Sequence, residues 1–393
     1  MSTPQTMQAA VIDGDHLTLK EVPVPELRDG FVLVKNRAVA GNPTDWKHIT
    51  WKIGPQGSIA GCDIAGEIVK LGPNVDTNKF KVGQKVYGFV HGASVKHPDN
   101  GGFATYSALD SKIAYTVDDS FEVSGKDQIP EGAIKYYEDV ATLPISLTTA
   151  GAVLTTNFNI NLEWQPSEAQ RDFHILFWGG ATAVGQLLIQ VAKKLHGYKK
   201  IIAVASKKHE AHLKSYGADD VFDYHAADGI EQIKNKYPDI QNLVDCVSNN
   251  DTIKQVYAVA SETKPATIVQ LTTLSINDIP ESERKDNKTI VGCLLYCASG
   301  EEIPFGAFTL PANPEFREKV IKFIEFISPK VIAGDIHHIP VKVYKNGLND
   351  VQQILDDIQY NRNSGEKLVA VLNWKINLIY SPFIITSNLP RSK

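Results

Sequence analysis

The stretch FHILFWGGATAVGQLLIQVAKKL, residues 173–195, decides the fold class of this chain. Its first six residues form a short apolar run rich in aromatic side chains, which predicts a parallel strand covered on both faces. From Val184 to Leu195 apolar residues recur at helical spacing, and Lys193 and Lys194 suit the negative end of the helix dipole. A strand, a glycine-rich turn and a helix in this order predict a phosphate-binding site at the helix N-terminus.

The glycine-rich turn supplies the predicted phosphate contacts. They come from Gly180, Thr182, Ala183, Val184 and Gly185. Gly180 permits the tight turn, and Gly185 lets the helix lie close to the strand. Because Thr182 stands where the usual G-x-G-x-x-G pattern has its middle glycine, the match is incomplete. A turn that merely joins a strand to a helix is the alternative, but a second apolar strand at residues 201–205 completes the context of a dinucleotide-binding sheet.

The end of that second strand bears on the choice between NADPH and NADH. A carboxylate at this position selects NAD by bonding the ribose 2′-hydroxyl. Here the chain reads Ser206-Lys207-Lys208, and no acid comes before Glu210. We therefore predict NADPH, with its 2′-phosphate near these three residues and with Tyr224 as a further neighbour. The alternative is that the two lysines are only solvated and that NADH binds.

The rest of the chain predicts a second, β-rich domain. Residues 8–107 contain short alternating strands broken by glycine and proline, which is typical of an antiparallel, barrel-like domain, and few helices are expected before residue 145. A chain of 393 residues also exceeds the usual size of one core. The predicted organisation is a catalytic domain at 1–146, a dinucleotide-binding domain at 147–328, a return to the catalytic domain at 329–373 and a C-terminal extension at 374–393 whose order is left undecided.

The composition is that of an ordinary soluble enzyme, with 43% hydrophobic residues, 22% charged residues and a net charge of −5. It gives no basic footprint for nucleic acid, no apolar run approaches the roughly 20 residues that span a bilayer, and residues 1–10 do not resemble a signal peptide. The four cysteines are too scattered for a disulfide framework. We therefore expect a reducing compartment, the cytoplasm with the nucleus left open, and no membrane or nucleic-acid partner.

Several local motifs together resemble the zinc-free branch of the medium-chain dehydrogenase/reductase superfamily. They are GNPTDWK at 41–47, GCDIAG at 61–66, Leu143-Pro144 with Thr149-Ala150, the turn at 179–185, and SGEKLV at 364–369. These motifs follow one another in the same order as in the family, and the resemblance covers nearly the whole chain. It is greatest to fungal trans-acting enoyl reductases and yeast aldehyde or alkenal reductases. The resemblance implies an α/β fold, with a GroES-like catalytic domain, a doubly wound parallel Rossmann sheet and the active site between them.

The resemblance also predicts that no metal is bound. Zinc members of the superfamily carry a cysteine in the first motif and a His-Glu pair in the second, and the matching positions here are Asn42 and Cys62-Asp63. Their four-cysteine structural lobe has no counterpart, and Cys293 and Cys297 lack partner ligands nearby. Catalytic zinc needs three good protein ligands. The resemblance instead places Asn42 among the cofactor contacts.

Without a metal, the reaction must suit hydride delivery to an already polarised carbon. The prediction is reduction of an α,β-unsaturated carbonyl compound by NADPH, with side-chain donors stabilising the developing enolate. Direct reduction of a reactive aldehyde to an alcohol, quinone reduction, and a binding protein that senses the dinucleotide are the alternatives. By family analogy a homodimer is expected, and a trans-acting synthase partner is left open.

Two catalytic residues follow from the resemblance. Lys47 is predicted to stabilise the enolate or to act as the acid; the alternative is a surface lysine that anchors a loop. Thr149 resembles the family threonine beside the nicotinamide; the alternative is a helix cap, which Ser146 or Thr148 could equally supply. Tyr87 and Tyr106 could donate protons but more readily suit strand packing.

Further contacts are predicted from segments late in the chain. Residues 293–302 resemble the wall of the nicotinamide end, with Leu295 contacting the cofactor and Tyr296 packing on the substrate; a buried edge strand is the alternative. Leu271, at the end of an apolar strand, is a further cofactor contact. Lys367 resembles the lysine that approaches the cofactor phosphates, or else is solvated. His337 and His338 are predicted to be surface or interface residues.

Overall fold

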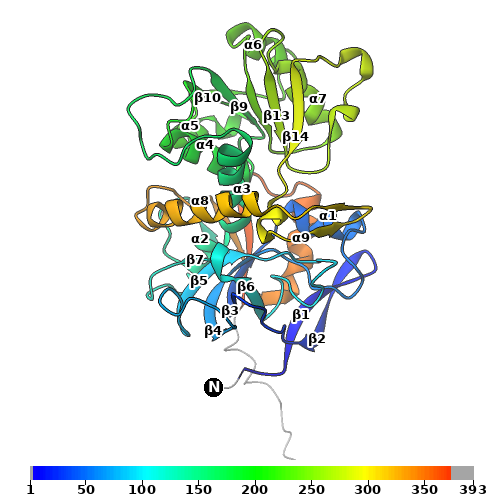
Figure 1. Cartoon of the computed structure of the whole chain (residues 1–393), viewed down its shortest axis with the longest axis vertical. Helices are drawn as coiled ribbons and strands as arrows, with labels where there is room; N and C mark the ends of the chain where they lie inside the picture. Colours follow the sequence, from blue (N-terminus) through cyan, green and yellow to red (C-terminus); the bar gives the residue numbers. More distant parts are fainter. Residues whose placement is uncertain (1–2, 373–393) are drawn as a thin grey trace, which may run out of the picture.

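The computed structural model describes residues 3–372 and consists of two halves that lie one above the other in Figure 1. The predicted extension at 374–393 lies outside the described residues. We call the lower half the β-rich half and the upper half the parallel-sheet half. Within residues 3–372, no helix is both long and apolar enough to cross a membrane.

The parallel-sheet half has the predicted doubly wound architecture. Its strands are β9 (His174–Trp178), β10 (Lys200–Val204), β11 (Asp220–Phe222), β12 (Asn242–Asp245), β13 (Ala266–Gln270) and β14 (Lys288–Gly292). Its helices are α4 (Ala183–Lys194), α5 (Glu210–Tyr216), α6 (Gly229–Lys236) and α7 (Asn250–Val259). All neighbouring strands are parallel, in the order β11-β10-β9-β12-β13-β14. Numbered along the chain this is 3-2-1-4-5-6, the order of the Rossmann fold, whose ligands bind outside the carboxyl ends of the strands.

The β-rich half is built on a curled sheet that joins distant parts of the chain. Its strands are β3 (Phe31–Ala40), β4 (Asp63–Leu71), β5 (Lys85–Phe89), β6 (Tyr106–Asp110), β7 (Tyr115–Thr116), β8 (Gln128–Ile129), β17 (Val341–Tyr344) and β18 (Lys367–Val371). A separate hairpin is formed by β1 (Thr6–Asp13) and β2 (His16–Pro23). Because β18 pairs with β3, the end of the described chain lies beside its beginning.

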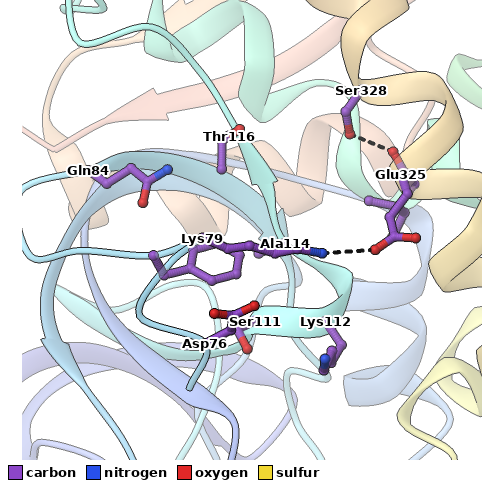
Figure 2. Close-up of a pocket in the computed structure, with 11 residues that line it drawn as sticks. Asp76, Lys79, Gln84, Ser111, Lys112, Ala114, Thr116, Glu325 and Ser328 are labelled. Atoms are coloured by element: carbon purple, nitrogen blue, oxygen red, sulfur yellow. Dashed lines mark hydrogen bonds and ion pairs between the residues drawn. The ribbon is translucent and has the colours of Figure 1, made fainter. Parts of the chain in front are cut away.

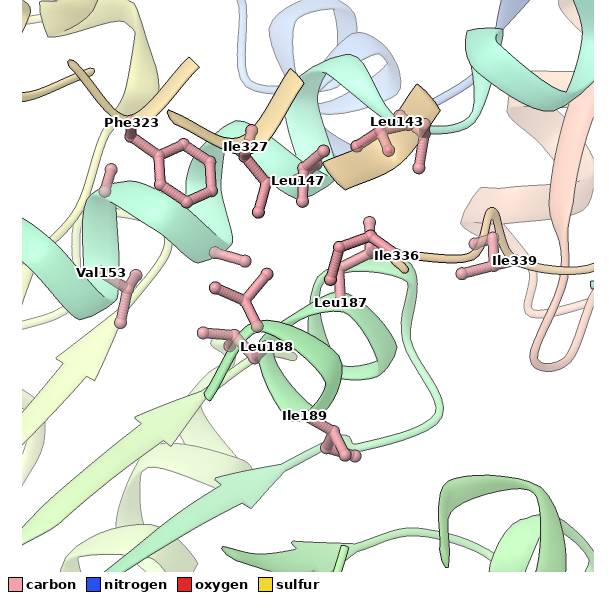
Figure 3. Packing of buried hydrophobic residues seen from close by; sticks show 14 of the residues in the cluster. Leu143, Leu147, Val153, Leu187, Leu188, Ile189, Phe323, Ile327, Ile336 and Ile339 are labelled. Atoms are coloured by element: carbon pink, nitrogen blue, oxygen red, sulfur yellow. The ribbon is translucent and has the colours of Figure 1, made fainter. Parts of the chain in front are cut away.

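Helices α3 (Pro144–Ala152) and α8 (Pro314–Ile332) lie between the two sheets (Figure 1). Figure 3 shows Leu147 of α3 and Leu187 of α4 in one apolar cluster with Phe323 of α8, and burying each such side chain contributes about 1.5–3 kcal/mol. Gly151 is needed here, because a Cβ would lie 2.3 Å from the Phe323 ring. α8 continues through the predicted boundary at residues 328 and 329.

Helices are few before residue 145, as expected. Among the described residues ahead of α3 they are α1 (Pro43–Thr50), the short 3-10 helix η1 (Ser111–Ile113) and α2 (Tyr137–Ala141). The start of α1 carries a local signal: Asn42 is the N-cap, proline is the first helical residue, and Asp45 Oδ2 accepts a hydrogen bond from the Asn42 N–H at 2.7 Å.

Residues 293–302 are not an edge strand. They contain the 3-10 helix η6 (Leu295–Ser299), which ends at Gly300 with a φ of 73°, in the left-handed region that favours glycine. The remaining strands and helix are β15 (Ile303–Phe305), β16 (Phe308–Leu310) and α9 (Val351–Gln359). The apolar residues that suggested a strand are therefore buried by packing of this 3-10 helix against other elements, and not by a place in a sheet.

Candidate active site

The glycine-rich turn has the geometry of a phosphate-binding site. Thr182 is the N-cap of α4, and its Oγ1 accepts a hydrogen bond from the Gly185 N–H at 3.1 Å. A Cβ on Gly185 would lie 2.4 Å from the carbonyl oxygen of Gly179, so only glycine lets the helix approach the turn. Ala183 and Val184 are in the first turn, where backbone N–H groups have no acceptor within the helix. The threonine in place of the middle glycine therefore serves as a helix cap.

The residues predicted for the 2′-phosphate lie at the same edge of the sheet. Ser206 precedes a short 3-10 helix, Lys207–His209, directly after β10. Lys207 and Lys208 are both exposed, and the Lys207 ammonium is 2.9 Å from the carboxylate of Glu210. Tyr224 follows β11, is 52% exposed, and borders a small cavity of about 90 Å³ that also contacts Trp178. These positions surround the carboxyl ends of β9, β10 and β11.

Lys47, in α1 of the β-rich half, lies near the same edge of the parallel sheet. Its ammonium lies 5.7 Å from the ring centroid of Trp46 and 5.2 Å from that of Trp51. Burial lowers the pKa of Lys47, and the negative charge of Asp245, the last residue of β12, partly offsets that effect. The structure therefore places Lys47 near the parallel sheet and not on a fully solvated loop.

Lys367 forms a buried polar cluster with Asn42 and Asp63. Its ammonium is 2.9 Å from Asp63 Oδ2 and donates a hydrogen bond to Asn42 Oδ1, and the Asn42 amide donates to Asp63 Oδ2 at 2.9 Å. Lys367 is 4% exposed and directed at these two residues, so the solvated alternative was wrong. Its approach to the cofactor phosphates stays a prediction. Asp63 Oδ1 accepts from the Ile145 N–H at 2.8 Å, so the cluster also fixes the start of α3.

The nicotinamide-end residues occupy three different elements. Thr149 is 5% exposed in the middle of α3, whose N-cap is Leu143, so the helix-cap alternative was wrong. Leu271 directly follows β13, and its N–H donates to Ser248 Oγ at 2.8 Å. Leu295 is buried at the start of η6. The contacts of these three residues with a cofactor stay predictions.

Tyr87 and His338 are both buried. Tyr87 is 1% exposed and stacks on Tyr115 with ring centroids 4.7 Å apart, as expected for strand packing. His338 was expected at a surface or interface, but it is 2% exposed and lies 3.6 Å from Asp139. The surface alternative was therefore wrong for His338.

Around Tyr296 the structure assembles a polar cluster that sequence reasoning missed. The Tyr296 hydroxyl lies 2.7 Å from Thr44 Oγ1 and 3.3 Å from Cys62 Sγ. Its ring stacks on the His91 ring at 3.8 Å, and the His48 ring lies 5.5 Å away. The only local signal was the spacing of Thr44 and His48, which puts them on one face of a helix once α1 is recognised.

Hydrogen bonds fix the protonation of the two histidines. His48 Nδ1 lies 2.8 Å from the carbonyl oxygen of Thr44, so this nitrogen donates. His48 Nε2 is 3.4 Å from His91 Nε2 and therefore accepts. Burial lowers the pKa of His48 to about 4 and that of His91 well below its ordinary value, so both rings are neutral at pH 7.

Asp45 gives a stability prediction that depends on pH. Burial raises its pKa to about 7, although hydrogen bonds from Cys62 and Asn42 act in the opposite direction. An unfolded aspartate ionises near pH 4, so the folded state loses stability as the pH rises from about 4 to 7. We expect Asp45→Asn, which keeps an acceptor for the Asn42 N–H, to remove this loss.

Urea denaturation of both proteins at several pH values measures the effect. Relative to wild type, the free energy of unfolding of Asp45→Asn should increase by about 1–3 kcal/mol between pH 5 and pH 8. A difference that stays constant across this range would show that Asp45 ionises normally in the folded protein.

Within the described part of the chain, no three histidine, cysteine or acidic side chains gather closely enough to hold a metal ion. A cavity of about 240 Å³ lies between the β-rich half and α8, where Lys79 and Glu325 form an ion pair (Figure 2). None of its lining residues belongs to the predicted site.

Comparison with known proteins identifies the family. The profile described as "Alcohol dehydrogenase GroES-like domain" matches residues 28–119, and that described as "Zinc-binding dehydrogenase" matches residues 183–305. The Saccharomyces cerevisiae protein YNL134C is 61% identical over 94% of this chain and 99% of its own length. The trans-enoyl reductase ACTTS2 of Alternaria alternata is 32% identical over 93% of this chain and 98% of its own length.

Solved structures agree with this assignment at the level of the fold. The quinone oxidoreductase from Coxiella burnetii superposes with a TM-score of 0.65 at 22% identity, covering 94% of this chain and 100% of that one. Mycobacterial Rv1454c, solved as a complex with NADPH, gives a TM-score of 0.64 at 18% identity, covering 93% and 99%. The chain belongs to the medium-chain dehydrogenase/reductase superfamily. It is an oxidoreductase of that superfamily.

Proposed function

We propose that this oxidoreductase uses NADPH to reduce the activated double bond of an α,β-unsaturated carbonyl compound, without catalytic zinc. The observation that carries the proposal is the capped N-terminus of α4 at the carboxyl edge of a 3-2-1-4-5-6 sheet, with Lys47 of the opposite half brought near Asp245 at the same edge. Similarity to a trans-enoyl reductase and to a structure containing NADPH supports the reaction and the cofactor.

The turn at residues 180–185 fits the cofactor, because the absence of a Cβ at Gly185 lets the N-terminus of α4 lie against the turn, where its free N–H groups can meet a pyrophosphate. NADPH, when bound, supplies the hydride for the β-carbon of the substrate. The N–H groups of Ala183 and Val184 would hold the phosphates. Lys47, half-buried between two tryptophans, would stabilise the negative charge that develops on the carbonyl oxygen and hold a proton for it.

The chemistry of the donor set favours a reaction without zinc. A cysteine binds zinc as a thiolate. Burial and the neighbouring Asp45 raise the pKa of Cys62 well above its ordinary value, which makes the thiolate that zinc requires costly to form at this position. The amide of Asn42 is already hydrogen-bonded to Asp63 and to Lys367.

Steady-state oxidation of NADPH with a panel of enals, enones, quinones and simple aldehydes tests the proposal. The expected result is fastest turnover of the enals or enones, yielding the saturated carbonyl compound, in a protein that retains activity after dialysis against a chelator. An unsaturated alcohol as the product would instead identify an aldehyde reductase. Tight cofactor binding with no turnover of any compound would favour the sensing protein.

Quinone reduction is the second candidate, favoured by the superposition on the Coxiella burnetii quinone oxidoreductase. The same panel separates it, because a quinone reductase should show a higher kcat/KM for quinones than for enals. The two candidates share the cofactor site and differ only in the substrate.

Lys208 gives a prediction for cofactor choice. Lys207 and Lys208 are both exposed, but Lys207 is paired with Glu210, so we take Lys208 as the cation that meets the 2′-phosphate. We expect Lys208→Ala to raise the Kd for NADPH about tenfold and to leave the Kd for NADH within twofold, corresponding to about 1.4 kcal/mol. Isothermal titration calorimetry with both cofactors measures this. Lys214→Ala is the matched control, because that lysine pairs with Glu210 within α5.

A further inference from the structure

The segment Cys293–Glu302, which we call the wall segment, connects the two halves near Lys47 and Thr44. It starts on the parallel-sheet half, where the Cys293 N–H donates to the carbonyl oxygen of Gln270 at 2.9 Å. Its later residues contact the β-rich half at an inner and an outer point. The turn at Gly300 separates these two attachments.

The inner attachment is Tyr296. This residue is 6% exposed, with its hydroxyl against Thr44 and Cys62 and its ring stacked on His91. Phe305 closes the same apolar cluster. In the β-rich half, the Tyr296 hydroxyl meets a hydroxyl and a thiol, and its ring meets aromatic rings. The inner attachment therefore consists of ring packing and of the 2.7 Å hydrogen bond with Thr44.

The outer attachment is Glu301, which is met by basic side chains of the β-rich half. Its carboxylate lies 2.7 Å from the Lys96 ammonium, 3.7 Å from the Arg28 guanidinium and 3.5 Å from His97. Arg28 is itself held, since its guanidinium lies 4.0 Å from the Phe31 ring centroid and 2.6 Å from His97 Nε2. We call this group the Glu301 cluster.

Attraction between the Glu301 carboxylate and the neighbouring cations stabilises the outer attachment. Burial alone would raise the pKa of Glu301, but Lys96, His97 and Arg28 together lower it below its ordinary value. The side chain of Glu301 is 40% exposed, so one carboxylate between two permanent cations remains sensitive to salt. A network of this kind contributes more than an isolated surface pair.

We propose that Glu301 is a positioning residue, which fastens the wall segment to the β-rich half and so keeps Tyr296 seated against Thr44 and Cys62. Glu301 acts from outside the reacting groups, through the four residues 297–300 that connect it to Tyr296. Its kinetic consequence rests on the proposed function, whereas its structural consequence does not. Loosening the wall segment widens the substrate end of the site and leaves the phosphate-binding turn unchanged.

Hydrogen–deuterium exchange tests the structural consequence without any substrate. In Glu301→Gln we expect the amides of residues 295–299 to exchange at least tenfold faster than in wild type. Glu325→Gln is the matched control, because the Lys79–Glu325 pair in Figure 2 is also an ion pair with the β-rich half, at 3.2 Å, but it comes from α8 and lies at the cavity of about 240 Å³. That control should leave the exchange at 295–299 unchanged. Equal exchange in Glu301→Gln and wild type would overturn the proposal.

Kinetics test the functional consequence. With the best substrate found, Glu301→Gln should raise the substrate KM five- to tenfold, with kcat and the KM for NADPH within twofold of wild type. The substrate KM of wild type should rise between 50 and 500 mM NaCl, whereas that of Glu301→Gln should stay flat, and Glu301→Asp should restore part of the effect. Wild-type kinetics in Glu301→Gln would refute the proposal. If wild type itself turns over no substrate, the proposed function fails, and hydrogen exchange alone decides the role of Glu301.

Discussion

Replacing Ala183 with glutamate is expected to abolish dinucleotide binding while leaving the protein at least as stable as wild type. Ala183 is the first residue of α4, where a negative side chain interacts favourably with the helix dipole by about 0.3–1 kcal/mol. The same carboxylate would stand where the proposed pyrophosphate is bound. Two like charges about 4 Å apart repel by about 4 kcal/mol at an effective dielectric constant of 20, so we expect at least a hundredfold loss of affinity.

The measurement is calorimetric titration with NADPH and NADH, together with the thermal unfolding midpoint of each variant. Ala183→Gln has nearly the same size without the charge, and its loss of affinity should be no more than about tenfold. If Ala183→Glu bound either cofactor normally, the phosphates would lie elsewhere and the proposed site would be wrong. A fall in stability of Ala183→Glu alone would show that the substitution disturbs α4.

The sequence was sufficient to predict the parallel-sheet half because its signals are local. Continuous apolar strands, the turn at residues 179–185 and an amphipathic helix each depend on neighbouring residues. Even the departure from the glycine pattern has a local explanation, since Thr182 caps the helix that follows it. The strand order then follows from the right-handed crossovers of successive β-α-β units.

Residues that meet across the fold could not be predicted in this way. Asn42 is separated by 21 positions from Asp63 and by 325 from Lys367, yet the three share one buried cluster. A buried lysine and a solvated one read alike in sequence, which explains why a solvated Lys367 could not be excluded. The Tyr296 cluster was missed for the same reason, because its partner Thr44 is 252 positions away.

The Lys367 cluster supports the second large prediction, that Lys367→Met lowers the free energy of unfolding by about 3–5 kcal/mol. Asp63 is fully buried, and removing the ammonium leaves its charge with only the hydrogen bonds from Asn42 and from the Ile145 N–H. Urea denaturation at pH 7 measures the change. Lys342→Met on the neighbouring strand is the control, because its ion pair with Asp357 is 38% exposed on the lysine side and should contribute less than about 1 kcal/mol.

A double-mutant cycle separates the ion pair from the volume of the lysine. Asp63→Asn keeps an oxygen for the Ile145 N–H but removes the charge, so it should also destabilise by leaving Lys367 unpaired. The double variant Asp63→Asn with Lys367→Met buries no charge, and its loss should be smaller than the sum of the single losses by about 2 kcal/mol or more. Additive losses would mean that the two groups are not coupled and that Lys367 stabilises the fold through packing alone. Coupled losses would instead show that the ion pair itself stabilises the cluster in which Asn42 precedes α1, Asp63 begins β4 and the Ile145 N–H belongs to α3.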